Sequence, residues 1–195
     1  LDRDLMLSLN GVGLTAGTHM QDGVNGVDGI GAVMGVAISP DKKHLYTVSW
    51  GEHAVSIFSR DENTGALTYV GMMKDGINGV DGLGGGWGII VSPDGKHVYA
   101  TGNADNAIAI FSRNATTGEL TYVGMMKDGT NGVDGLSAAR KLMISPDGKN
   151  IYAAAASDNA VSMFSRDETT GELTYLGIVK QGVNGVCGLA TPTTV

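Results

Sequence analysis

A short segment that returns at a constant spacing constrains this chain more than any other feature. Leu-Thr-Tyr-Val at 67–70 recurs at 120–123 and, as Leu-Thr-Tyr-Leu, at 173–176, with 53 residues between copies. One further step back leads to Leu-Thr at 14–15. Such a period indicates tandem supersecondary units that stack on one another. We therefore expect one repeat domain over residues 1–195, with units at 14–66, 67–119 and 120–172 and a partial unit at 173–195.

The pattern inside each unit predicts four antiparallel strands. Ser-Pro-Asp occurs at 39–41, 92–94 and 145–147, between apolar segments, and proline followed by aspartate is typical of a tight turn in a hairpin. A third segment, such as Ala-Val-Ser-Ile-Phe at 54–58, alternates large and small residues as a strand does. The Leu-Thr-Tyr segment supplies the fourth. Four-stranded antiparallel units are typical of propeller blades, which we place at 35–73, 88–126 and 141–179.

The same motifs resemble a known family. Ser-Pro-Asp-Gly-Lys-X-Val-Tyr, Asp-Asn-Ala-X-X-X-Phe-Ser-Arg, Thr-Gly-X-Leu-Thr-Tyr and Asp-Gly-X-Asn-Gly-Val-Asp-Gly-Leu are similar to repeats of lactonase-type β-propellers and of the broader YVTN-like surface repeat. The resemblance spans residues 14–186 and implies an all-β fold. Because three complete blades are fewer than the four to eight of a closed propeller, we expect a partial propeller or a fragment of a larger one.

The composition restricts the classes of partner and the kinds of site that this chain can have. Thirteen basic against twenty acidic residues leave a net charge of −7, which repels a nucleic-acid backbone. No apolar stretch approaches the roughly 20 residues that span a bilayer, so we expect no transmembrane segment. With Cys187 as the single cysteine, neither an intrachain disulfide nor a zinc site built on several cysteines is possible.

Loops between consecutive blades carry oxygen-bearing side chains at every third position. Glycine bends such a loop, and calcium binds six to eight oxygens, so calcium is a possible cofactor; no other is indicated. The alternative is that aspartate, asparagine and glycine are simply the residues that turns prefer. The last copy is an internal control, since Gln181 and Cys187 replace its two aspartates. The candidate metal ligands are Asp22, Asn25, Asp28, Asp75, Asn78, Asp81, Asp128, Asn131 and Asp134.

Positions that differ between otherwise similar blades are where a channel site would be built. Met34, Trp87 and Arg140 are repeat-equivalent but chemically unlike, and Trp87 and Arg140 are our candidates for ligand contact in the channel. Packing between blades is the alternative for both side chains. His44 and His97 each follow a Ser-Pro-Asp turn, and we expect them at the surface.

Three functional hypotheses follow. The first is a non-enzymatic protein-binding or scaffold module, favoured by near-identical blades without a singular catalytic group. The second is a lactonase-like hydrolase with its site at the propeller channel, around Arg140 and an acidic loop residue. The third is a calcium-stabilised adhesion repeat. Open blade edges present unpaired backbone groups, so we also expect a protein partner or self-association there, and an extracytoplasmic location (secreted, periplasmic or lumenal).

Overall fold

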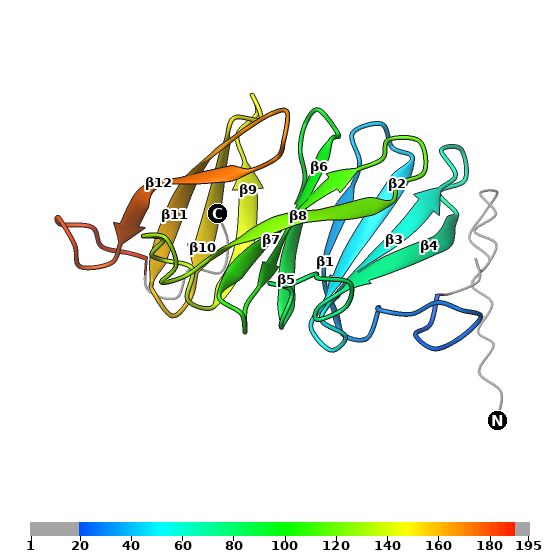
Figure 1. Cartoon of the computed structure of the whole chain (residues 1–195), viewed down its shortest axis with the longest axis horizontal. Helices are drawn as coiled ribbons and strands as arrows, with labels where there is room; N and C mark the ends of the chain where they lie inside the picture. Colours follow the sequence, from blue (N-terminus) through cyan, green and yellow to red (C-terminus); the bar gives the residue numbers. More distant parts are fainter. Residues whose placement is uncertain (1–19, 190–195) are drawn as a thin grey trace, which may run out of the picture.

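The computed structural model describes residues 20–189, and these form three four-stranded antiparallel sheets. Within each sheet the strands pair in chain order, so every sheet is one up-and-down blade. Figure 1 shows the three blades side by side along the long axis of the molecule, in chain order. The expected all-β architecture of propeller blades is confirmed, and the chain forms part of a propeller.

The blade boundaries agree with the predicted ones to within two residues at each end. The first blade contains β1 (Val33–Ile38), β2 (His44–Ser49), β3 (Ala54–Arg60) and β4 (Leu67–Lys74). The second contains β5 (Gly86–Val91), β6 (His97–Gly102), β7 (Ala107–Arg113) and β8 (Leu120–Lys127). The third contains β9 (Ala139–Ile144), β10 (Asn150–Ala155), β11 (Ala160–Arg166) and β12 (Leu173–Lys180).

The Ser-Pro-Asp segments form the first hairpin of each blade, as predicted. In the first blade the Ser39 hydroxyl accepts a bond from the amide of His44 (3.0 Å) and donates to Asp41 (2.5 Å). The turn needs one residue with positive φ, which is Lys42 here and Gly95 and Gly148 in the other two blades. Glycine adopts that backbone conformation at no steric cost, which explains its place in the repeat.

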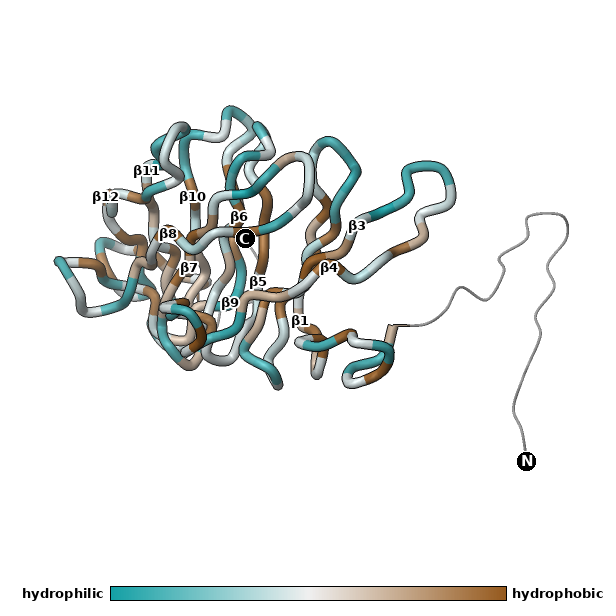
Figure 2. Tube along the Cα trace, turned by 45° about the vertical axis from the view of Figure 1, so that its right-hand side comes forward, coloured by the Kyte–Doolittle hydropathy of each residue, from teal (hydrophilic) through white to brown (hydrophobic). Residues whose placement is uncertain are grey.

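The hydrophobic core lies between blades as well as within them. One cluster joins Tyr46 and Val48 of the first blade to Ile89 and Phe111 of the second. The other joins Tyr99 and Ile108 of the second blade to Leu142, Ile151 and Phe164 of the third. In Figure 2 the apolar residues lie mainly in the strands, and many of the connecting loops are hydrophilic. Packing against its neighbours therefore helps to stabilise each blade, as in other repeat proteins.

Some predictions fall on residues that the structure does not describe. The start of the predicted unit 14–66 and the end of the partial unit 173–195 lie outside residues 20–189. Within that range, no helix is long and apolar enough to cross a membrane.

Candidate functional site

The inner strands of the three blades lie next to one another and bring the unlike residues of the repeat into one region. β1 contacts β5, and β5 contacts β9. Met34, Trp87 and Arg140 each occupy the second position of an inner strand. Trp50, directly after β2, joins them, because its ring meets that of Trp87 edge to face at 5.6 Å. Neither its equivalent in the second blade, Asn103, nor that in the third, Ala156, is aromatic.

Arg140 is the charged member of this cluster. Its guanidinium carbon lies 4.7 Å from the centre of the Trp87 ring, a cation–π arrangement. Its Nε is buried without a hydrogen-bond partner, and among residues 20–189 no carboxylate forms an ion pair with it. Trp87 and Arg140, our candidates for ligand contact, therefore touch each other, and their contact with a ligand stays a prediction.

The backbone beside this cluster is packed too tightly for any side chain. A Cβ on Gly88 would overlap the carbonyl oxygen of Arg140. Thr101 stabilises the close approach, because its hydroxyl accepts a bond from the Gly88 amide (2.8 Å) and donates to the Arg140 carbonyl (3.0 Å). These hydrogen bonds of Thr101 therefore join the second and third blades where Trp87 contacts Arg140.

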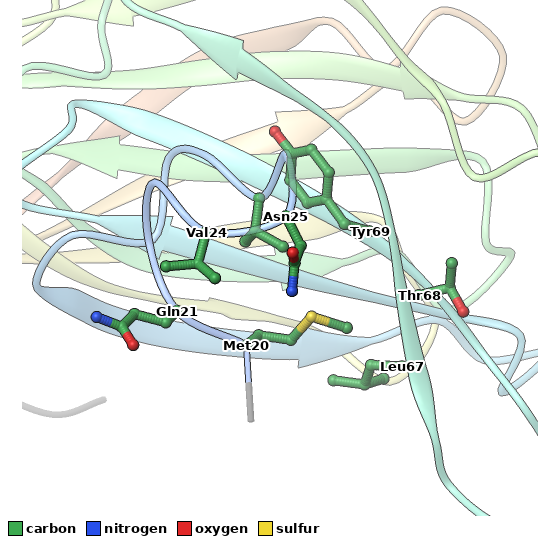
Figure 3. A pocket seen from close by; sticks show the side chains of 8 residues that line it. Met20, Gln21, Val24, Asn25, Leu67, Thr68 and Tyr69 are labelled. Atoms are coloured by element: carbon green, nitrogen blue, oxygen red, sulfur yellow. The ribbon is translucent and has the colours of Figure 1, made fainter. Parts of the chain in front are cut away.

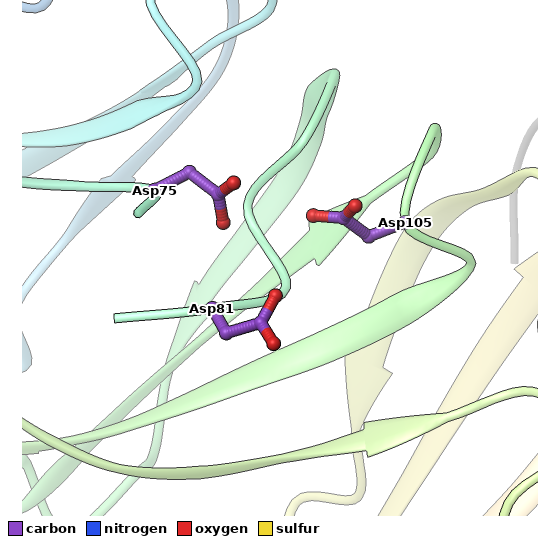
Figure 4. Close-up of side chains that lie close together, drawn as sticks. All are labelled: Asp75, Asp81 and Asp105. Atoms are coloured by element: carbon purple, nitrogen blue, oxygen red, sulfur yellow. The ribbon is translucent and has the colours of Figure 1, made fainter. Parts of the chain in front are cut away.

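The aspartate loops do bring carboxylates together. Asp75 and Asp81 lie in the loop between the first and second blades, and Asp105 joins them from the β6–β7 turn, with carboxylate oxygens within 4.8 Å of one another (Figure 4). Asp128, Asp134 and Asp158 repeat the arrangement one blade later. Sequence analysis missed Asp105 and Asp158 because they come from a different turn.

Most of these carboxylates already accept a hydrogen bond from a backbone amide through one oxygen. The first aspartate of the loop accepts a bond from the amide eight residues later, as between Asp75 and Leu83 (3.0 Å). Asp22 and Asp128 do the same, and in the last copy the Gln181 side chain accepts the equivalent bond from Leu189 (2.8 Å). An uncharged amide can therefore perform this role. It is a structural one, and calcium at these loops stays a prediction.

Two further observations support turn formation by these loops. Asn25, Asn78, Asn131 and Asn184 all have φ between 51° and 53°, the left-handed conformation that asparagine tolerates better than most residues. In the later cluster, the Lys180 ammonium lies 3.0 Å from Asp158 and 4.0 Å from Asp134, so a side-chain cation already balances part of that charge.

An arginine from each later blade inserts into the blade before it. Arg113 donates to the Tyr46 hydroxyl (2.8 Å), to the Gly95 carbonyl (2.9 Å) and to both oxygens of Asp41 (2.7 and 3.0 Å). Its guanidinium also lies 2.7 Å from Nδ1 of His44. We call the group Asp41, His44 and Tyr46 the arginine socket of the first blade. Arg166 binds the socket of the second blade, Asp94, His97 and Tyr99, in the same way.

The prediction of surface histidines is wrong. His44 and His97 are buried, because each forms part of a socket and its ring packs against Gly118 or Gly171 of the following blade. Burial lowers the pKa of both histidines, and the adjacent guanidinium lowers it further. Burial also raises the pKa of Asp41, but hydrogen bonds from Ser39 and Arg113 outweigh this and bring it to about 2.

A separate cleft of about 370 Å³ lies between the loop that precedes β1 and strand β4. Figure 3 shows Met20, Val24 and Asn25 of the loop facing Leu67 and Tyr69 of the strand. Within residues 20–189, the polar side chains that line it are the amides of Gln21 and Asn25 and the hydroxyls of Thr68 and Tyr69.

Comparison with known proteins now decides the family. The sequence profile of the family described as "Lactonase, 7-bladed beta-propeller" matches residues 35–188. The chain belongs to this family. Membership accounts for the repeat, the four-stranded blades and the packing between them, and it confirms the resemblance seen in the sequence.

Individual relatives agree. A 6-phosphogluconolactonase of Formosa agariphila is 36% identical over 90 residues, which are 45% of this chain and 24% of that protein. A crystal structure of a candidate 6-phosphogluconolactonase from Bacteroides uniformis superposes with a TM-score of 0.65 at 27% identity, covering 81% of this chain and 41% of that one. The periplasmic gluconolactonase of Pseudomonas aeruginosa (TM-score 0.63, 22% identity, 75% and 39% covered) shares the fold. This chain therefore spans less than half the length of these proteins.

The first functional hypothesis is corrected by these findings. Near-identical blades suggested a non-enzymatic scaffold, but the relatives are lactonases and the family carries that name. The near-identical sequences of the blades reflect the packing that all blades share. A substrate site in a propeller needs only a few positions that differ between blades, so similar blades are no argument against an enzyme.

Proposed function

We propose that this chain is part of a lactone hydrolase, and that Arg140 and Trp87 belong to its substrate site. A lactonase adds water to a cyclic ester: the carbonyl carbon gains a hydroxyl, the ring C–O bond breaks, the ring oxygen takes up a proton to become an alcohol, and the resulting carboxylic acid releases a proton to leave a carboxylate. The relatives point to lactones of sugar acids as the substrate class. Family membership carries the proposal, and the chemistry of the inner strands supports it.

The Arg140 guanidinium suits the charge that develops in this reaction. Negative charge appears on the carbonyl oxygen during attack and remains on the product carboxylate, and a preorganised cation stabilises both. Because no carboxylate of residues 20–189 pairs with Arg140, its charge is available to a substrate. The face of Trp87 orients the guanidinium, and the edge-to-face contact with Trp50 orients Trp87 in turn.

Steady-state hydrolysis of glucono-δ-lactone and its 6-phosphate by the native polypeptide tests this proposal. Arg140→Ala should lower kcat/KM by about 100-fold, the usual effect of removing one oxyanion donor, and Arg140→Lys should restore part of it. Val123→Ala, on the outer strand β8 of the second blade, is the control and should leave kcat/KM unchanged. Absence of lactone hydrolysis, or equal rates for wild type and a folded Arg140→Ala variant, would contradict the proposal.

The cellular location stays a prediction. The periplasmic gluconolactonase agrees with the expected extracytoplasmic location, but at 22% identity it supports the fold alone.

A further inference from the structure

One threonine hydroxyl connects the two residues that we place in the substrate site. Thr101 of β6 is fully buried. Its hydroxyl accepts a bond from the amide of Gly88, the residue after Trp87, and donates to the carbonyl of Arg140. A hydroxyl has a single hydrogen to donate, so the two bonds together fix its orientation. The backbone next to Trp87 and the backbone of Arg140 are therefore held relative to each other by this one side chain.

The other two blades lack this hydroxyl. The repeat equivalents of Thr101 are Val48 in the first blade and Ala154 in the third. A residue that every blade needed would return in every blade, as the Ser-Pro-Asp turn does. Thr101 instead belongs, with Trp87 and Arg140, to the positions that differ between otherwise similar blades.

Packing between blades does not explain the hydroxyl. At the first junction Gly35 approaches the carbonyl of Trp87 as Gly88 approaches that of Arg140, because a Cβ on either glycine would lie too close to the facing oxygen. The side chain beside Gly35 is that of Val48, which has no group that can donate or accept a hydrogen bond. Two inner strands therefore reach this close approach without a hydroxyl. What distinguishes the second junction is that the strand being held carries Arg140.

The same hydroxyl alters the strand that carries Trp87. Each inner strand shows a register shift, typical of a β-bulge, at the position of Trp87, and in the first and third blades pairing resumes with the very next residue. The resumed pairs are Gly35 with Val48 and Lys141 with Ala154. In β5 pairing resumes only at Ile89, and the Gly88 amide binds the Thr101 hydroxyl. Because bulges re-aim side chains, Thr101 influences the direction in which Trp87 projects.

We infer that Thr101 is a positioning residue of the lactone site, whose hydroxyl holds the Arg140 guanidinium on the face of Trp87. The inference rests on the function proposed above. Because Thr101 is fully buried, it acts through Arg140 and Trp87 and not on the substrate itself. A cation stabilises developing charge best when its position is fixed before the reaction begins. Thr101 supplies this fixation from the backbone, and the Trp87 ring supplies it at the guanidinium.

Steady-state hydrolysis of glucono-δ-lactone by the native polypeptide and its variants tests the inference. Thr101→Val keeps the shape of the side chain and should lower kcat by about 10-fold, less than Arg140→Ala, because the guanidinium is displaced and not removed. KM should stay nearly unchanged, since this lactone carries no charge until it is attacked. Thr101→Ala, with the residue of the third blade, should behave alike, and Thr101→Ser should recover most of the loss.

Thr47→Val is the matched control. Thr47 is also a buried threonine in the second strand of a blade, and its hydroxyl makes no hydrogen bond within residues 20–189. The control should therefore leave kcat and KM unchanged. Circular dichroism of every variant shows whether the fold is kept.

A double variant separates positioning from a general structural role. If Thr101 acts through Arg140, Thr101→Val combined with Arg140→Ala should be as slow as Arg140→Ala alone. Two losses that multiply would overturn the inference. It would also be overturned if folded Thr101→Val had the wild-type kcat while Arg140→Ala was slow, a result that leaves the proposed function intact.

Failure of the proposed function gives a different result, in which the wild type hydrolyses no lactone or Arg140→Ala is as fast as the wild type. Fluorescence then still measures whether Thr101 holds the pair. In a Trp50→Phe background Trp87 is the single tryptophan, and Thr101→Val should shift its emission in the same direction as Arg140→Ala, because both weaken contact with the guanidinium. Emission that responds to Arg140→Ala but not to Thr101→Val would refute the positioning role.

Discussion

Replacing Arg113 by methionine should strongly destabilise the first blade junction. Methionine keeps most of the aliphatic length, so the change removes the guanidinium and leaves little cavity. The Gly95 carbonyl and Nδ1 of His44 lose their charged donor, whereas Asp41 keeps its bonds to Ser39 and Lys43, and Tyr46 keeps its bond to Gly118.

The size of the expected loss in stability follows from the hydrogen bonds that are lost and those that are kept. Breaking a buried ion pair by removing one partner costs ~3–5 kcal/mol. Because the Asp41 side chain is 33% exposed and keeps two hydrogen bonds, we expect the lower end, about 3 kcal/mol. Arg60→Met removes a half-buried side chain with a single long hydrogen bond, and should cost less than about 1 kcal/mol.

Urea unfolding followed by the fluorescence of Trp50 and Trp87 can compare the two variants in dilute solution. The midpoint for Arg113→Met should fall well below that of Arg60→Met, with similar slopes, since a change in midpoint at constant slope reports stability. If the two variants unfold at the same midpoint, the inserted arginine does not hold the blades together and the argument from the socket fails.

Three further predictions concern the same structure. His44 and His97 have a lower pKa in the folded than in the unfolded state, so the unfolded state binds more protons as the pH falls. The free energy of unfolding should therefore decrease as the pH falls below about 6.5. Thermal unfolding of a His44→Asn/His97→Asn variant should show a weaker dependence on pH. Asp128→Gln should cost under about 1 kcal/mol in urea unfolding, because Gln181 makes the equivalent bond, while Asp128→Ala should cost about 1–3 kcal/mol; equal losses would contradict the backbone-capping role. Gly88→Ala should lower stability by about 1–3 kcal/mol through overlap with Arg140, whereas Gly71→Ala, which meets open space, should not.

The local part of the fold was predictable because its causes are local. The Ser-Pro-Asp turn forms from bonds between residues at most five positions apart, such as Ser39 with Asp41 and His44. A strict period of 53 residues then carries each strand into the next blade. Strand boundaries were therefore accurate even though no contact between blades had been identified.

The sockets were not predicted because their partners lie far apart in the chain. Asp41 and Arg113 are separated by 72 residues, as are Asp94 and Arg166, and this exceeds the repeat by more than a third of a unit. The sequence did contain a clue, since the aspartate and the arginine both recur with the period of the repeat and lie 72 residues apart in each pair. Nothing in the local pattern, however, says that an arginine ending the third strand of one blade enters the first hairpin of the blade before it. His44 was misplaced for the same reason.

The aspartate loops and the channel cluster show how repetition separates structure from chemistry. A residue that returns in every blade, such as the first aspartate of each loop, supports a contact that every blade makes, and its replacement by Gln181 keeps that contact. Met34, Trp87 and Arg140 share a position without sharing chemistry, so packing common to all blades does not explain their differences. Arg140 combines a charge that no carboxylate of the described residues balances with a fixed aromatic neighbour, which is why we place the substrate there.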